Sequence, residues 1–267
     1  MELFFQQYPE SYLPNKDSAM PLVIVPGLFG STTNWRGLGR KLGEHLPVIV
    51  VDQRNHGKSP HADSNNYFDM ASDLLEFIDY QGIDRINLCG HSMGGKVAMV
   101  FSLLYPQRVE SLVVLDIAPT EYVHSHAPYL EKMMSIELKS LESRSAADKK
   151  LIEAIPDTST RLFLLQSLVG SRGSFEWRLN LPVLLRDMPK ITSFPSELSE
   201  LSNRVQSLFI SGEQSNYLTE ANHSQILEYF PSASFMAISS AGHWLHAEQP
   251  QAVLMALLNF LQKGKKK

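Results

Sequence analysis

One serine of this chain stands in a sequence that favours a reactive side chain. Residues 90–94 read GHSMG, a G-x-S-x-G pattern with Ser92 at its centre. The preceding segment, 85–89, predicts a buried strand, and residues 95–101 predict the first turns of a helix. A strand that turns sharply into a helix exposes such a serine as a nucleophile. A side chain at either flanking glycine would collide with the neighbouring strand or helix, so we expect the turn to require both glycines.

A serine hydroxyl is a weak nucleophile at neutral pH and needs a base within hydrogen-bond reach. Of the nine histidines, His243 follows the last strand-like run, at 235–238, and precedes the closing helix. We therefore expect it on a loop at the same edge as the serine. The backbone of His91, inside the turn, faces the wrong way for a base, and His246 is expected to pack or cap the next segment. His243 is the predicted general base.

The carboxylate that should orient this histidine has two candidates. Where a serine stands at such a strand-to-helix turn, the expected order of the three residues along the chain is serine, acid, histidine. The acid most often follows the strand corresponding to residues 208–210, where the turn offers Glu213 and no aspartate. Asp116 instead closes an earlier strand and should emerge beside the serine, where it could accept the Nδ1 proton of His243. A turn or helix-cap role before Pro119 is the alternative for Asp116. We favour Asp116 over Glu213.

Acyl transfer through a serine nucleophile also needs backbone N–H donors for the oxyanion of the tetrahedral intermediate. Met93, the residue after the nucleophile, is the first predicted donor. The second is expected from the glycine-rich turn at 26–30, where Leu28 is the first choice and Phe29 the next. The alternative is that this segment is a turn with no catalytic part.

The elements that must position these residues alternate between strands and helices. Strand-like runs occur at 22–25, 48–51, 85–89, 112–115, 208–210 and 235–238, and helix-like patterns at 70–78, 95–101 and 252–261. Continuous β-branched runs are expected of parallel strands that are buried on both faces. The sequence therefore predicts an α/β fold with a mostly parallel, twisted sheet flanked by helices.

Residues 121–201 break this alternation, because they hold no convincing strand. Helices are predicted at 129–141, 146–155 and 160–169, before a looser segment punctuated by Pro182, Pro189 and Pro195. We predict a core of residues 1–120 and 202–267, and a helical lid of residues 121–201 over the carboxyl ends of the strands. The alternative is a helical layer with no role at the site. Five apolar residues could line a pocket or form the core of the lid: Met133, Met134, Leu164, Leu168 and Trp177.

Composition narrows the class of protein and its compartment. A net charge of −4 gives no reason to expect a nucleic acid or an anionic membrane as partner. Cys89 is the single cysteine, which excludes an internal disulfide and favours a reducing compartment. No secretion signal and no apolar run of the ~20 residues that a membrane span requires are present. We expect a cytoplasmic globular protein whose lysine-rich end, residues 263–267, is solvated.

Taken together, these motifs resemble the α/β-hydrolase superfamily, and especially its bacterial YbfF-type esterases, over essentially the whole chain. The segments that carry the resemblance are GLFGS at 27–31, DQRNHGKS at 52–59, GHSMGG at 90–95, DIAP at 116–119 and AGHW at 241–244. In that subgroup the acid lies on the earlier strand, which supports Asp116. Pro26 departs from the histidine that many relatives carry before the glycine. The resemblance implies that segment 52–59 braces a loop and that His56 is not catalytic.

The resemblance implies a serine esterase or thioesterase that needs no cofactor, and we predict no metal site. The expected reaction is hydrolysis of a small-molecule carboxylic ester with a small to medium acyl chain, through an acyl-enzyme. The alternatives are an acyl-CoA thioesterase, a C–C bond hydrolase and a hydrolase-like ligand sensor. Arginines at 161, 172, 178 and 186 give only scattered positive charge toward a CoA nucleotide, and are expected to be solvated surface residues. The sequence does not indicate an oligomeric state.

Overall fold

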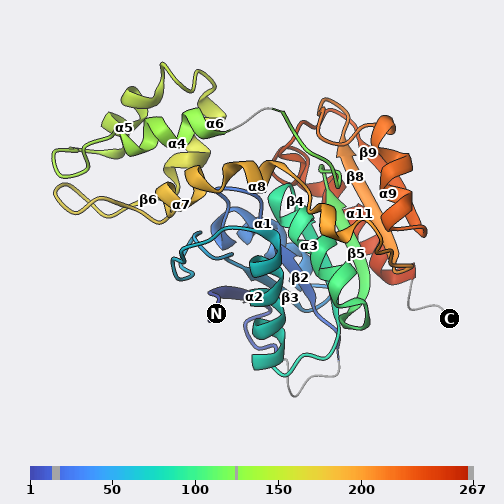
Figure 1. Cartoon of the computed structure of the whole chain (residues 1–267). Coiled ribbons are helices and arrows are strands. Elements are labelled where there is room, and N and C mark those ends of the chain that lie inside the picture. Colours follow the sequence, from blue (N-terminus) through green and yellow to red (C-terminus); the bar gives the residue numbers. More distant parts are fainter. Residues whose placement is uncertain (14–18, 124–125, 264–267) are drawn as a thin grey trace.

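Seven strands form one sheet at the centre of the fold, which we describe from a computed structural model covering residues 1–13, 19–123 and 126–263. The strands are β1 (Phe5–Tyr8), β2 (Leu22–Val25), β3 (Val48–Val51), β4 (Ile86–His91), β5 (Val109–Leu115), β8 (Gln206–Gly212) and β9 (Ala233–Ile238). Their order is β1-β3-β2-β4-β5-β8-β9, and every neighbouring pair is parallel except β1 with β3 (Figure 1). The predicted mostly parallel sheet is confirmed.

The central strands are apolar because both of their faces are covered. Every residue of β2 and β3 is buried. Along β2, Val23 and Val25 enter the larger hydrophobic core, whereas Leu22 and Ile24 enter a second core on the other side. Since successive side chains of a strand point to opposite faces, each β-branched residue finds a partner layer.

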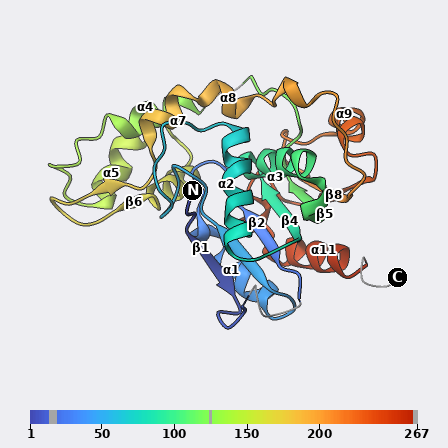
Figure 2. The same ribbon diagram turned by 60° about the horizontal axis from the view of Figure 1, so that its bottom comes forward.

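Two layers of helices supply these partners. The core helices are α1 (Thr32–Gly43), α2 (Tyr67–Tyr80), α3 (Met93–Leu104), α9 (His223–Tyr229), α10 (Leu245–Glu248) and α11 (Pro250–Lys263). Helices α2 and α3 cover one face of the sheet, and α1 and α11 cover the other (Figure 2). The helix after the serine begins earlier than expected, at Met93, directly behind the turn.

The segment between β5 and β8 stands beside the carboxyl edge of the sheet (Figure 1). Its elements are α4 (Ala127–Met134), α5 (Arg144–Leu151), α6 (Thr158–Leu165), β6 (Leu168–Val169), β7 (Glu176–Trp177), α7 (Leu181–Arg186) and α8 (Met188–Thr192). The prediction that residues 121–201 hold no strand is wrong, because β6 and β7 pair as an antiparallel hairpin. Gly170 and Gly173, both at positive φ, shape its turn.

The prolines of this segment begin short helices instead of loosening it, so the expected looser segment is wrong. Pro182 lies in the first turn of α7, and Pro189 lies in the first turn of α8. Pro195 caps a short 3₁₀ turn. A proline lacks the N–H group that the first turn of a helix leaves unpaired, so it fits there at little cost.

A buried lysine of α3 ties both ends of the segment to the core. Lys96 is 1% exposed, and its ammonium donates hydrogen bonds of 2.7–2.8 Å to three backbone carbonyls, those of Thr120, Thr192 and Ser193. The Tyr122 N–H also donates to the Thr192 carbonyl at 3.0 Å, so the chain leaves the core and returns to it at one place. Figure 2 shows α8 crossing above α2 and α3.

The expectations about the lysine-rich end and about a membrane span can be compared with the structure only within the described residues. The lysine-rich end falls outside them from residue 264 on. Within the described ranges, no helix combines the length and the apolar character that crossing a membrane demands. Cys89 is buried inside β4.

Candidate active site

Ser92 lies at the junction of β4 and α3 in a strained conformation, with φ 53° and ψ −122°. Positive φ is unfavourable for a residue with a side chain and persists only where the surroundings impose it. Here the surroundings are two glycines. A Cβ on Gly90 would overlap the carbonyl oxygen of Gly94, and one on Gly94 would overlap that of Val25. The predicted strand–serine–helix turn and its need for glycine are confirmed.

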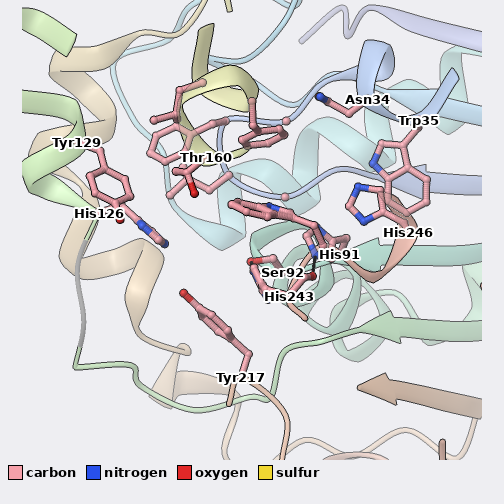
Figure 3. Close-up of a pocket in the computed structure, with 17 residues that line it drawn as sticks. Asn34, Trp35, His91, Ser92, His126, Tyr129, Thr160, Tyr217, His243 and His246 are labelled. Carbon is pink, nitrogen blue, oxygen red and sulfur yellow. Dashed lines mark hydrogen bonds between the residues drawn. The ribbon is translucent and has the colours of Figure 1, made fainter. Parts of the chain in front are cut away.

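The structure brings the three residues singled out from the sequence into one hydrogen-bonded chain. Figure 3 shows two of them, Ser92 and His243, at the wall of the pocket. His243 Nε2 lies 2.9 Å from Ser92 Oγ, and His243 Nδ1 lies 2.7 Å from Asp116 Oδ2. A carboxylate can only accept, so Nδ1 carries the proton and Nε2 is free to accept from the serine hydroxyl. This is the arrangement that activates a serine in acyl transfer.

Asp116, rather than Glu213, is the carboxylate in contact with the histidine. Its side chain is completely buried at the end of β5. The Gly212 N–H donates to Oδ1 at 3.1 Å, and the Ser215 hydroxyl donates to Oδ2. Glu213 is exposed and accepts instead from the Ser240 N–H at 3.0 Å. The extra donors fix the plane of the Asp116 carboxylate.

Sequence reasoning missed two residues of the loop after β8 that hold this pair together. The Tyr217 ring stacks on the His243 ring with centroids 3.9 Å apart, and the Tyr217 N–H donates to Ser215 Oγ. Burial, followed by the charge of Asp116, raises the pKa of Tyr217 to about 12, so the phenol stays neutral. The sequence could have pointed to both residues by their position, because they follow the strand after which the acid of the triad is most often found.

Two further histidines near the site, His91 and His246, are buried and neutral. His91 Nε2 lies 2.8 Å from the His243 carbonyl oxygen, and the His246 ring stacks on Trp35 at 4.4 Å. Burial lowers the pKa of His91 well below its usual value and that of His246 to about 3. Their positions agree with the expectations that His246 packs and that His91 does not face the serine hydroxyl.

The two expected oxyanion donors both belong to segments that lie against the serine. Met93 is the first residue of α3, where an N–H has no partner within the helix. Leu28 belongs to a tight turn closed by the Gly30 N–H on the Gly27 carbonyl at 2.9 Å. This turn approaches the nucleophile so closely that a Cβ on Gly27 would lie 3.1 Å from Ser92 Cβ. The choice of Leu28 over Phe29 stays a prediction.

Two cavities meet at Ser92. The larger, of about 790 Å³, is lined by His243 and Trp244 from the core and by residues of α4 and α6 from the segment above (Figure 3). The smaller, of about 370 Å³, is lined by both oxyanion candidates and reaches Lys96. Burial lowers the pKa of this lysine to about 7, against the opposing effect of Glu121.

Only one of the five apolar residues considered for a pocket lines either of these cavities, and that residue is Leu164. Met133 and Leu168 are completely buried in the core, and Met134 is 43% exposed. Trp177 is half-buried against the core. The inserted segment therefore shares the large hydrophobic core of the sheet, α2 and α3, and most of these five side chains pack into that core rather than line the site.

The four arginines considered for nucleotide binding do not form one patch. The expectation that all are solvated is wrong for Arg161, which is buried and bonds Asp148 at 2.7 Å. Arg186 pairs with Asp187, and Arg172 is exposed. Arg178 lines a third, polar cavity of about 710 Å³ together with Arg36 and Lys58.

The loop at residues 52–59 has the bracing role that the resemblance implied. The Asp52 carboxylate accepts from the N–H groups of Thr32 and Lys58 at 2.6 and 2.8 Å. His56 is buried, and its Nδ1 lies 2.8 Å from the Arg54 carbonyl oxygen, away from the serine. In the part of the chain that the structure describes, no three His, Cys, Asp or Glu side chains gather where they could hold a metal ion.

Comparison with known proteins agrees with this geometry. A sequence model of the α/β-hydrolase fold family matches residues 20–250. The sn-1-specific diacylglycerol lipase ABHD11 of Mus musculus is 38% identical over 95% of this chain and 85% of its own. Esterase YbfF of Escherichia coli K12 is 37% identical over 92% of this chain and 95% of its own. A solved marine microorganism esterase superposes with a TM-score of 0.89 at 36% identity, covering 97% of this chain and 99% of its own. The chain belongs to the α/β-hydrolase fold family.

Proposed function

We propose that the protein is a serine esterase that hydrolyses carboxylic esters of small molecules. The observation that carries this proposal is the hydrogen-bonded chain from Ser92 Oγ through His243 to Asp116, at the mouth of two cavities. Relatives that are 37–38% identical over nearly the whole chain and are named esterase or lipase support it.

In this proposal His243 Nε2 takes the hydroxyl proton while Ser92 Oγ attacks the ester carbonyl carbon. The carbonyl electron pair moves onto oxygen, which accepts from the N–H groups of Leu28 and Met93. The intermediate then expels the alkoxide, which receives its proton from His243, and an acyl-serine remains. Water repeats both steps and releases the acid. Asp116 stays ionised throughout and stabilises the imidazolium.

Hydrolysis of p-nitrophenyl esters of increasing acyl length tests the proposal. Ser92→Ala is expected to lower kcat roughly 10⁴–10⁶-fold with folding intact, because the nucleophile is lost. Ser140→Ala, at an exposed serine, is the matched control and should keep wild-type turnover. Near wild-type turnover by Ser92→Ala would exclude the proposal. Absence of turnover by the wild type on every ester would favour a C–C bond hydrolase or a ligand sensor.

An acyl-CoA thioesterase is a second candidate because of the third cavity. Phe29 and Asn34 line both this cavity and the large one, so the two adjoin. Arg178, on its wall, has a buried Nε without a hydrogen-bond partner among the described residues. Guanidinium groups suit phosphates, which a CoA leaving group carries.

The test compares an acyl-CoA with the same acyl group on N-acetylcysteamine, which has the thioester and no phosphate. If the third cavity binds the nucleotide, Arg178→Met raises KM for the CoA substrate alone. Arg172→Met, at an exposed arginine outside the cavity, is the control. An equal effect of Arg178→Met on both substrates would exclude a role in phosphate binding.

We further propose that residues 121–201 act as a lid on a core of residues 1–120 and 202–267. Five residues of the segment that line the large cavity support this assignment: His126, Tyr129, Thr160, Phe163 and Leu164. We also propose a cytoplasmic location, since the single cysteine gives no disulfide to an oxidising compartment. Cell fractionation followed by immunodetection tests that location.

A further inference from the structure

The two cavities at Ser92 hold different parts of the proposed machinery. His243 and Trp244 line the large cavity and not the small one, among the residues that the structure describes. Leu28 lines both cavities, whereas Met93 lines only the small one. The small cavity therefore begins at the oxyanion side of the serine, and the large cavity begins at its histidine side.

This division assigns the two halves of an ester. The leaving oxygen must come within hydrogen-bond reach of His243 Nε2 to receive its proton, so the alcohol lies on the side of the large cavity. The carbonyl oxygen points at the N–H groups of Leu28 and Met93. The remaining substituent of the carbonyl carbon, the acyl chain, is then directed toward the small cavity.

One wall of the small cavity is fixed by polar bonds. Lys96 lies there with its ammonium held by three carbonyls, and it is 1% exposed. Tyr67, also almost fully buried, donates its hydroxyl to the Ile191 carbonyl. Moving either side chain would leave buried polar groups unpaired, so this wall does not yield to a longer chain.

The walls are apolar and come from both parts of the molecule. Ile117, 3% exposed, follows β5, and its Cγ2 packs where a Cβ on Gly95 would overlap it. Ile191, 6% exposed, belongs to α8 of the inserted segment. The Ile191 carbonyl accepts the hydrogen bond from Tyr67, so Ile191 contributes its apolar side chain to the wall of the cavity.

We propose that the small cavity binds the acyl group and restricts it to a short chain, and that Ile191 determines the permitted length. The large cavity, lined by aromatic residues such as Phe163 and Trp244, takes a bulky apolar alcohol. The substrate class is a short-chain acyl ester of such an alcohol. This inference rests on the proposed esterase activity.

Two series of esters separate the halves of the substrate. In one, p-nitrophenol is constant and the acyl chain grows from acetyl to decanoyl. In the other, acetyl is constant and the alcohol grows from ethyl to dodecyl. For the wild type, kcat/KM is expected to fall at least roughly tenfold for each methylene that no longer fits the acyl cavity. It should hold or rise along the alcohol series.

Ile191→Ala enlarges the small cavity and leaves the backbone carbonyl that Tyr67 needs. We expect its acyl optimum to move to a longer chain, with about a tenfold gain on the first ester that the wild type rejects. Its alcohol series should keep the wild-type shape. Phe163→Ala is the matched variant in the large cavity, and it should change the alcohol series while the acyl optimum stays.

Thermal unfolding of each variant shows whether it is folded, and Ile191→Val gives a smaller shift in the same direction if Ile191→Ala does not fold. An acyl optimum that moves in Phe163→Ala and not in the Ile191 variants would overturn the inference. So would a wild type that accepts long acyl chains and rejects long alcohols. Absence of turnover on both series is a different result, because it removes the proposed function itself.

Discussion

Ser92 and Asp116 each adopt a φ of 53°, in a region that costs a residue with a side chain roughly 1–3 kcal/mol. The parallel sheet holds both in place. The Ser92 N–H donates to the Leu115 carbonyl at 3.0 Å, and the Asp116 N–H donates to the Ile210 carbonyl at 2.8 Å. Nucleophile and acid are therefore set by the backbone of neighbouring strands, before any substrate binds.

The contacts of the two carboxylates predict opposite results for two isosteric changes. Asp116→Asn places an amide against His243 Nδ1 and disfavours the tautomer that activates the serine, so kcat should fall by up to roughly 10⁴-fold. Glu213→Gln should keep wild-type activity, since among the described residues its side chain bonds the Ser240 N–H and not His243. Steady-state kinetics on p-nitrophenyl butanoate measures both. The reverse pattern would contradict the assignment of the acid.

At the scale of elements, α3 serves the site twice. Its first residue follows the serine, and one turn further on Lys96 binds the carbonyls at both ends of the inserted segment. A shift of α3 would therefore change the turn at Ser92 and the position of α8 together. The turn at Ser92 and helix α8 are coupled because α3 joins them directly, through the chain at one end and through the hydrogen bonds of Lys96 at the other.

Lys96→Met tests this link, because it keeps much of the side-chain volume and removes all three donors. The Thr192 carbonyl keeps the Tyr122 N–H, whereas the carbonyls of Thr120 and Ser193 lose their donor at a cost of about 1–3 kcal/mol each, so the free energy of unfolding should fall by a few kcal/mol. Hydrogen exchange should also quicken in the amides of α8. Lys149→Met, at an exposed lysine of α5, is the control. Unchanged stability and exchange in Lys96→Met would show that water satisfies those carbonyls.

For the whole molecule, three buried histidines predict a loss of stability in mild acid. Burial lowers the pKa of His56 to about 4 and of His246 to about 3, and that of His91 also falls. Below the usual value of 6.5 the unfolded chain binds protons that the folded chain does not, so stability falls as pH falls toward 4. Each histidine contributes up to about 1.4 kcal/mol per pH unit in this window.

The measurement is the thermal midpoint of unfolding between pH 7 and pH 4. Carboxylates titrate at the lower end, so a difference between variants isolates the histidine. His246→Phe keeps an aromatic ring against Trp35 and should show a shallower decline than the wild type. His45→Gln, at an exposed histidine, should follow the wild type. Parallel curves for His246→Phe and the wild type would refute the argument.

The nucleophile, the base and the central strands were predictable because each carries its signal within a few residues. Choosing between Asp116 and Glu213 needed the pairing of β4 with β5. That register sets His91 opposite Leu115, so the residues that follow the two strands emerge side by side. No local pattern contains this information. The stacking of Tyr217 on His243 depends likewise on a contact between distant loops.

The sequence did not predict β1, α1 or the β6–β7 hairpin, because none of these elements carries a clear pattern within its own residues. Strand β1 reads FQQY and shows no apolar run, because it is an antiparallel edge strand. Helix α1 contains three glycines, which are weak helix formers. A Cβ on Gly39 or Gly43 would overlap Tyr8 of β1, so these glycines allow helix and strand to pack closely. The β6–β7 hairpin has strands of two residues each, too short to show a period.

The single crossing point of the inserted segment bears on how such an enzyme diversifies. Because Tyr122 and Thr192 are hydrogen-bonded to each other, the stretch between them leaves the sheet and returns to it at the same place. Because no strand of the seven-stranded sheet lies within the described residues of that stretch, changes of its sequence leave intact the strand pairing that holds the serine, the acid and the histidine. Ile191 lies just inside this boundary, so changes within the stretch can alter the small cavity along with the large one.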